Sequence, residues 1–247
     1  GRVRGLTTIA VGAFFVLTAI ALSVILGTAV GATNMPYRVG TYVVFNGKSG
    51  YQLPQCTIST NPYGGANGTY NLLNCLAIED NGTWVVIRFY YQSGDEGIIL
   101  WFGNAQYSST PNYYTPWLYV GDNGYLYFGD WAGSSAYQVS LPLTTGWHTV
   151  VAGEYFSGGT YYFIVYLDST GNSATTSTTN LPQLFGYQSS FPYGNIGTGY
   201  SGGWPSVGES NTWWFYNGYI QYIVIYAGNT SKIENELTTW LDTEGSN

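Results

Sequence analysis

Few side chains in this sequence have the types and spacing that acid–base chemistry needs. Only 8% of the 247 residues are charged, and His148 is the one His. A glycosidase uses two carboxylates that face one cleft, and on a strand this requires acids two residues apart. The pairs Glu79-Asp80 and Asp95-Glu96 are adjacent instead, so their side chains would point to opposite faces or lie in turns. We therefore expect no catalytic residue and no enzymatic activity.

Charge and ligand types also limit the partners. A net charge of −7 with six Lys and Arg cannot neutralise a run of phosphates, so nucleic acid is not an expected partner. One His and two Cys are too few for a structural zinc site. Asp122, Asp130 and Asp168 carry the oxygen ligands that calcium prefers, but Asp is equally expected in turns. We predict no metal site and no cofactor.

The only two cysteines, Cys56 and Cys75, are predicted to form a disulfide. They lie in a segment that we expect outside the cell, where disulfides persist. In the chain-entropy model a loop of this length stabilises the fold by about 3 kcal/mol. Two free buried thiols are the alternative.

Three Asn-X-Ser/Thr triplets begin at Asn67, Asn81 and Asn229. Such triplets are acceptors for N-glycosylation in secreted chains, and all three lie in turn-like contexts. We predict a glycoprotein with at least one of them occupied.

The chain is rich in aromatic side chains, with 25 Tyr and 9 Trp. An aromatic ring stacks on the C–H face of a sugar while nearby polar groups bind its hydroxyls. Most Trp side chains are expected to fill a core. Trp131 and Trp204 stand in Gly-rich segments and are predicted to be the exposed carbohydrate contacts.

The N-terminal part predicts a long helix over Leu6–Ala32. No charge falls between Arg4 and Arg38, and a helix of this length, about 40 Å, spans a bilayer. Apolar residues occupy all its faces, so lipid or other helices must cover it all round. The expected assembly residues are Leu6, Ile9, Val11, Phe14, Phe15, Leu17, Ile20, Leu22, Ile25 and Leu26. The basic residues before it predict that the rest of the chain lies outside the cell.

The remainder predicts an antiparallel β-sandwich, or jelly roll, so that residues 1–35 and 36–247 form two parts of a mainly β protein. Short aromatic and β-branched runs alternate with turn residues. The expected strands are Thr41–Asn46, Thr83–Tyr91, Gly97–Phe102, Trp117–Val120, Tyr125–Phe128, His148–Glu154, Tyr161–Asp168 and Tyr219–Tyr226. Gly121–Gly124 predicts a hairpin turn. Thr170–Asn180 is expected to be an exposed loop, and Lys232–Asp242 a short C-terminal helix.

Residues 117–241 resemble a laminin-G-like, concanavalin-A-like jelly roll. The resemblance rests on Gly146-Trp147-His148, on the run Tyr161–Asp168, and on Phe215-Tyr216-Asn217-Gly218-Tyr219-Ile220. These occur in the family's order and spacing. The resemblance implies the sandwich fold, but the fold hosts lectins, adhesion modules and glucanases alike.

The N-terminus resembles archaeal type IV pilins and archaellins. Arg4-Gly5-Leu6 precedes an uncharged helix, and a β-domain follows. The resemblance implies that the helix lies in the membrane before assembly and bundles with copies of itself in the filament core afterwards.

Together these features predict a structural subunit of an extracellular type IV pilus-like filament. The partners would be copies of the same chain, with the β-domain facing outward to adhere to surfaces or glycans. A monomeric, membrane-anchored lectin or adhesin is the first alternative, and a viral coat protein is the second.

Overall fold

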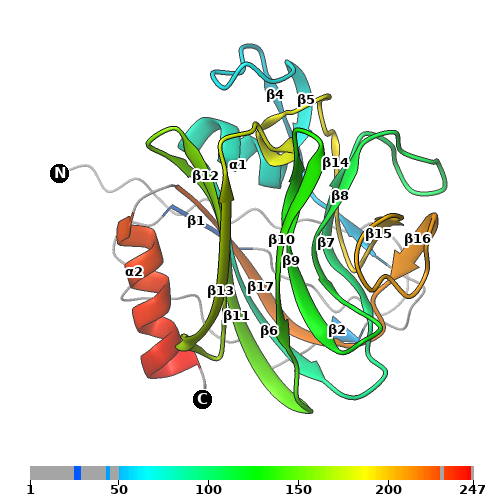
Figure 1. The fold of residues 1–247 in the computed structure, drawn as a ribbon, viewed down its shortest axis with the longest axis vertical. Helices are drawn as coiled ribbons and strands as arrows, with labels where there is room; N and C mark the ends of the chain where they lie inside the picture. The colour runs from blue at the N-terminus through cyan, green and yellow to red at the C-terminus, as the bar shows by residue number, and fades with distance from the viewer. Residues whose placement is uncertain (1–24, 29–42, 45–49, 229–230, 246–247) are drawn as a thin grey trace.

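The computed structural model describes residues 25–28, 43–44, 50–228 and 231–245. Two β-sheets pack face to face, and short helices lie at the ends and on one outer face (Figure 1). All the strand pairs are antiparallel among the described residues, except β1 with β17 and β16 with β7.

The first sheet has seven strands. Their order is β1 (Ile25–Thr28), β17 (Tyr219–Ala227), β6 (Gly82–Tyr91), β11 (Gly146–Ser157), β12 (Thr160–Leu167) and β13 (Ser169–Thr178), with β2 (Val43–Val44) also paired to β17.

The second sheet has eight strands. Their order is β10 (Ser135–Pro142), β9 (Tyr125–Ala132), β8 (Tyr114–Val120), β7 (Gly97–Gly103), β14 (Tyr193–Ile196) and β3 (Tyr51–Gln52), with β15 (Thr198–Ser201) and β16 (Thr212–Phe215) forming a hairpin beside β7. The remaining elements are the hairpin β4 (Gln55–Ile58) and β5 (Gly68–Asn71), the helices α1 (Leu72–Asp80) and α2 (Ser231–Trp240), the 3-10 helix η1 (Gln183–Phe185) and the π-helix η2 (Leu241–Gly245).

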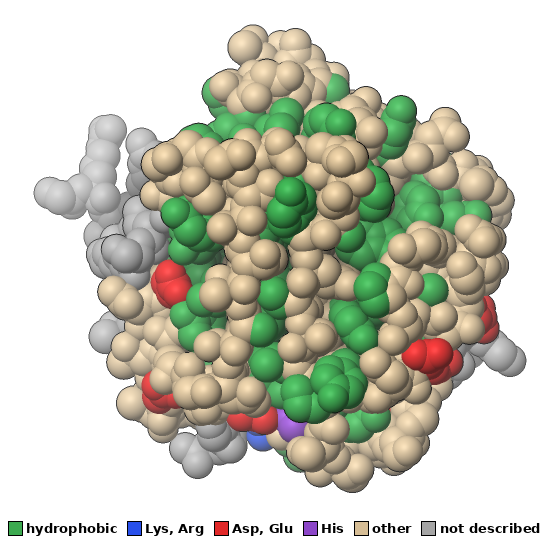
Figure 2. All heavy atoms as spheres, viewed as in Figure 1, with side chains coloured by type: hydrophobic (Ala, Val, Ile, Leu, Met, Phe, Trp, Pro, Cys, Tyr) green, Lys and Arg blue, Asp and Glu red, His purple; other side chains and the backbone are tan. Residues whose placement is uncertain are grey.

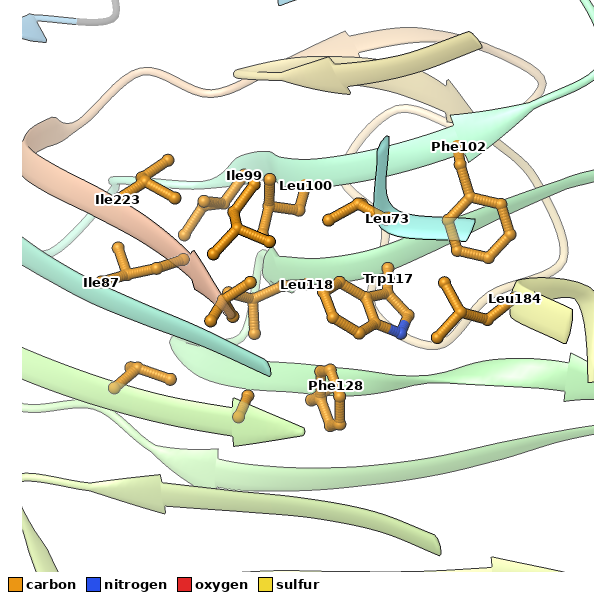
Figure 3. Packing of buried hydrophobic residues seen from close by; sticks show 14 of the residues in the cluster. Leu73, Ile87, Ile99, Leu100, Phe102, Trp117, Leu118, Phe128, Leu184 and Ile223 are labelled. Carbon is orange, nitrogen blue, oxygen red and sulfur yellow. The ribbon is translucent and has the colours of Figure 1, made fainter. Parts of the chain in front are cut away.

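The main core lies between the two sheets. In β12 the side chains alternate between half-buried and buried, as expected for a strand with one face against a core. Figure 3 shows Ile87 and Ile223 of the first sheet in one core with Leu118, Trp117 and Phe128 of the second sheet. A second apolar cluster lies on the outer face of the first sheet, where α2 packs Leu237 against β6 and β11. This second layer explains why β6 is buried on both faces.

The structure confirms the predicted β-sandwich and its short C-terminal helix. Each strand predicted between Thr83 and Tyr226 is present to within a few residues, and Gly121–Gly124 connects β8 to β9. Of the predicted strand Thr41–Asn46, residues 43–44 are described, and they form β2.

Two expectations about the β-domain, residues 36–247, were wrong. The Ser- and Thr-rich segment Thr170–Asn180 is not a loop, because its residues to Thr178 form strand β13 along β12. Thr is β-branched and fits an extended edge strand, so low complexity did not mean irregular structure. Helix α1 was also missed. It is buried over much of its length and therefore lacks a polar face that would reveal a helical period.

Most of the predicted helix Leu6–Ala32 lies outside the described residues. Its residues Ile25–Thr28 form β1 instead, parallel to β17 from Val224 to Ala227, so the helix prediction was wrong there. Short apolar runs suit a buried strand as well as a helix, and β17 offers a free edge. No described helix is long and apolar enough to cross a bilayer.

Candidate functional site

A groove of about 390 Å³ lies at the β14–β3 edge of the second sheet. Among the residues that the structure describes, none that lines it is charged. The lining residues are Gly50, Tyr51, Gln52, Gln106, Tyr107, Tyr193, Asn195, Thr198 and Phe215. Figure 2 shows a face of the molecule on which charged side chains are few and lie near the periphery.

Two amides form a cross-strand pair in this groove. Asn195 of β14 is the register partner of Gln52 of β3, so both side chains project from the same face of the sheet. The next residue, Ile196, packs in the core between the sheets, so the Asn195 side chain points outward. Asn195 is only 7% exposed, whereas Gln52 is exposed. The pair therefore places one amide at the surface of the groove and the other deeper inside it.

Aromatic rings flank the amides. Tyr193 lies two residues before Asn195 on the same face of β14. Tyr107, in the loop between β7 and β8, is 57% exposed. Its ring meets Trp213 edge-on at a centroid distance of 5.3 Å and Phe215 at 5.6 Å. The Trp213 indole N–H donates to the Ser109 carbonyl at 3.0 Å, and this bond ties the loop to β16. These contacts with β16 hold the loop between β7 and β8 in place, while Tyr107 remains exposed to solvent.

The floor beside the groove is built around Trp101. Its ring is fully buried under the β15–β16 hairpin, and its indole N–H donates to the Tyr200 carbonyl at 3.0 Å. Gly103 and Gly199 lie against this ring, and a Cβ at either position would come under 3.0 Å from it. The two glycines therefore let the hairpin, which carries Thr198 and Phe215 of the groove, lie close to the sheet.

A separate polar centre is buried between the sheets. Glu154 of β11 accepts a hydrogen bond from the Trp117 indole at 2.7 Å, and Asp130 of β9 accepts from the Thr115 hydroxyl at 2.6 Å and the Leu184 backbone N–H at 2.7 Å. Both carboxyl groups are fully buried. Burial raises the pKa of Asp130 to about 6, and burial together with the neighbouring Asp130 charge raises the pKa of Glu154. Neither group is among the described residues that line the groove.

The only histidine serves a structural contact. The Nδ1 and Nε2 atoms of His148 lie 2.6 Å from an Asp168 carboxylate oxygen and 2.6 Å from the Thr144 carbonyl oxygen. Both neighbours are acceptors, so both ring nitrogens must carry protons. Burial opposes this charge, but the two hydrogen bonds outweigh it and raise the pKa of His148.

The two predicted carbohydrate contacts do not line the groove. Trp204 is 7% exposed, so the expectation that it stands free was wrong. Its loop folds back onto the second sheet, where the Tyr119 hydroxyl donates to the Pro205 carbonyl at 2.7 Å. Trp131 is half-buried, and its indole N–H donates to the Gly133 carbonyl at 3.2 Å.

The predicted disulfide and the predicted glycosylation sites have different outcomes. The structure confirms the disulfide between Cys56 and Cys75, with a Cα–Cα distance of 6.2 Å between β4 and α1. Asn67 and Asn81 are exposed, whereas Asn229 lies outside the described residues. Occupancy of the three glycosylation sites stays a prediction. Within the described part of the chain, no three His, Cys, Asp or Glu side chains converge as a metal site.

The sequence does not identify the groove residues, because the topology of the sheet brings them together from distant parts of the chain. Gln52 and Asn195 are 143 positions apart in the sequence, and only the pairing of β3 with β14 brings them together. The Tyr side chains carried no signal that separated Tyr107 and Tyr193 from the other 23.

Comparison with known proteins yields structural similarity alone. No family model and no curated protein matches the chain. The carbohydrate-binding module CBM40 of the Ruminococcus gnavus IT-sialidase, solved with α2,3-sialyllactose, is 13% identical with a TM-score of 0.46, and the match covers 80% of this chain and 98% of the module. A leech intramolecular trans-sialidase is 14% identical with a TM-score of 0.49, covering 80% of this chain and 27% of the enzyme. Tailspike protein 2 of bacteriophage CBA120 is 12% identical with a TM-score of 0.39, covering 85% of this chain and 32% of the tailspike domain. None of these assigns a family to the chain.

Proposed function

We propose that the β-sandwich is a carbohydrate-binding domain and that the groove is its binding site. The observation that carries the proposal is the amide pair of Gln52 and Asn195 beside the aromatic rings of Tyr107 and Tyr193. Amides can donate to and accept from sugar hydroxyls at the same time, whereas rings cover the apolar C–H face of a sugar.

The dimensions of the groove support this proposal. Its volume of about 390 Å³ falls in the range of small-ligand sites. Tyr193 and Asn195 stand on one strand face, about 6.6 Å apart along the strand. This spacing suits one sugar ring that stacks on the tyrosine while its neighbouring hydroxyls reach the amide. Asn195 is 7% exposed and lines the groove, so a bound hydroxyl can hydrogen-bond to its amide.

A glycan array followed by calorimetry on the best ligand tests the proposal. Tyr107→Ala should weaken binding about tenfold, equivalent to ~1.4 kcal/mol. Tyr125→Ala is the matched control, because Tyr125 is also an exposed tyrosine, 40% accessible, but does not line the groove. Equal affinity of the two variants would contradict the assignment of the groove.

We further propose that the domain is carried by a filament-forming subunit at the cell surface. The support is the uncharged apolar run of residues 6–24, which as a helix would need lipid or neighbouring helices around it; Ile25–Thr28 belongs to the sheet instead. The Cys56–Cys75 disulfide suits an oxidising compartment outside the cytoplasm. In this proposal the chain binds glycans without transforming them.

Electron microscopy of the native protein without detergent tests the assembly. Ordered filaments are the expected result. Monomers that stay in solution only with detergent would contradict it and favour a membrane-anchored lectin instead. Virus-like shells would favour the coat-protein alternative.

A further inference from the structure

The one Lys or Arg side chain that the structure describes lies in the sheet that does not carry the groove. The sequence has six Lys and Arg residues. Among the described side chains, Arg88 is the only one of them, and it is 8% exposed on β6 in the other sheet. Its guanidinium donates to the Thr149 hydroxyl at 2.8 Å and lies 5.5 Å from the centre of the Trp147 ring. Arg88 is therefore engaged on the opposite side of the sandwich.

The charged side chain next to β7 in the sequence, Glu96, is an acid that does not itself line the groove. Glu96 directly precedes β7, whose Ile98 is the register partner of Phe215 in the groove. Burial and repulsion from Asp122 and Glu209 raise the pKa of Glu96. These acids therefore offer no attraction to a ligand that carries a carboxylate or sulfate.

We infer that the groove selects uncharged glycans and rejects acidic ones such as sialylated, uronic or sulfated sugars. This inference rests on the proposed carbohydrate-binding function. An acidic sugar would give up part of its hydration on entering the groove, and the lining side chains that the structure describes supply no cation in return. A neutral sugar exchanges water for amide hydrogen bonds and ring contact without that loss.

The chemistry of the lining specifies the ligand further. Gln52, Gln106 and Asn195 each offer both a carbonyl acceptor and an NH₂ donor. Such groups match hydroxyl pairs and acetamido groups, which also donate and accept. The preferred ligand is therefore a neutral hexose, or a neutral N-acetylhexosamine, with one apolar ring face free for Tyr193 or Tyr107.

The test compares matched oligosaccharides that share one neutral core and differ only in an added sialic acid, uronic acid or sulfate. We expect the full-length protein to bind the neutral forms at least tenfold more tightly than the acidic forms. We also expect the affinity for neutral forms to stay constant between low and high salt, because screening acts on charge–charge attraction alone.

The outcomes separate the inference from the function on which it rests. Tighter binding of the acidic forms, weakening as salt is added, would overturn the inference and leave carbohydrate binding intact. Binding to none of the glycans would overturn both.

Two charge variants sharpen the result. Gln106→Lys adds a cation to the groove and should increase the affinity for the acidic forms about tenfold, with a new dependence on salt. Asn172→Lys is the matched control, because Asn172 is an exposed residue of β13 in the other sheet, and it should change neither affinity. If Gln106→Lys still binds the neutral forms but binds the acidic forms no more tightly, then charge at the groove does not determine which glycans bind.

Lys48 needs a separate variant, because it precedes Gly50 of the groove by two residues and lies outside the described residues. Lys48→Gln should leave the preference for neutral forms as it is. If the native protein prefers the acidic forms and Lys48→Gln loses this preference, the inference is overturned, and Lys48 is the cation that attracts the acidic forms.

Discussion

Asp130 and Glu154 stand out at the scale of single residues, because two carboxyl groups share a buried site in a chain with only thirteen acids. One comes from each sheet, and the network around them includes Thr115, Trp117 and the backbone of Leu184. Two carboxylates cannot both be charged cheaply at such a site, so at least one holds a proton in the folded state.

Glu154→Gln should stabilise the protein at neutral pH. Burial raises the folded-state pKa of both carboxyl groups above their unfolded values, so the folded protein binds more protons than the unfolded chain. The contribution of the pair to stability is therefore fully present below about pH 4 and is lost as the pH rises through the raised folded-state pKa values. Glutamine imitates the protonated acid, since it can still accept from Trp117 and can donate toward Asp130. We expect a higher Tm than the native protein at pH 7, by roughly 2–4 °C for each kcal/mol relieved, and little difference at pH 4.

Thermal unfolding followed by circular dichroism checks this expectation, with Glu79→Gln as the control. Glu79 is exposed near the end of α1, so its variant should follow the native curve at both pH values. A Glu154→Gln protein whose advantage is the same at pH 4 and pH 7 would refute the shared-proton account.

His148 gives a second pH prediction. Its two acceptors, Asp168 and the Thr144 carbonyl, hold the charged ring, so this contact stabilises the fold below about pH 6.5 and weakens as the pH rises through the raised folded-state pKa. Asp168→Asn removes the negative partner and should lower the pKa of His148. The asparagine also suits the left-handed backbone of this position, with φ of 65°.

An NMR titration of the imidazole C–H signals measures that pKa, and the signals need no assignment because the chain has one His. The Asp242→Asn variant is the control, since Asp242 accepts from Thr170 rather than from the ring. A His148 pKa equal in Asp168→Asn and the native protein would contradict the role given to the ion pair.

At the scale of elements, the β15–β16 hairpin depends on how closely it approaches β7. Gly199→Ala would place a methyl group against the Trp101 ring. Overpacking of this kind costs about 1–3 kcal/mol, and it would also move Thr198 at the groove. We expect a lower Tm together with weaker glycan binding.

Gly171→Ala supplies the comparison for this variant. Gly171 also lies in a strand, but the nearest atom to an added Cβ is the Ser169 hydroxyl at 3.8 Å. Calorimetry and thermal unfolding of both variants should show an effect at Gly199 only. Similar losses in the two proteins would mean that glycine is needed for backbone reasons and not for contact with Trp101.

The sequence predicts strands well where one face meets the core and turns are marked. Tyr161–Asp168 alternates in burial as its pattern indicates, and Gly121–Gly124 forms the expected turn. Prediction fails where the environment is set by distant parts of the chain. Helix α1 is buried by the packing of η1 and β6 around it, and Ile25–Thr28 takes the conformation offered by the edge of β17. The groove belongs to this second class, because a register between β3 and β14 creates it.

At the scale of the whole molecule, scarcity of charge is the property that links stability and proposed function. Few carboxylates are left to be protonated in acid, and two of them are buried where acid favours the fold. The same scarcity leaves the groove without a described cation, so selection there depends on hydrogen bonds and ring contact.

The burial of Arg88 in the middle of β6 also bears on how the protein meets digestive enzymes. Trypsin cuts after Lys and Arg, and between Lys48 and Lys232 the sequence offers it Arg88 alone. That bond lies inside a sheet, with the side chain 8% exposed, so cleavage requires unfolding of the sandwich. Limited digestion followed by mass spectrometry should leave one resistant fragment that contains residues 49–232. Rapid cutting after Arg88 under native conditions would show that β6 opens readily. A surface protein built with this sequence would persist among secreted proteases of trypsin-like specificity.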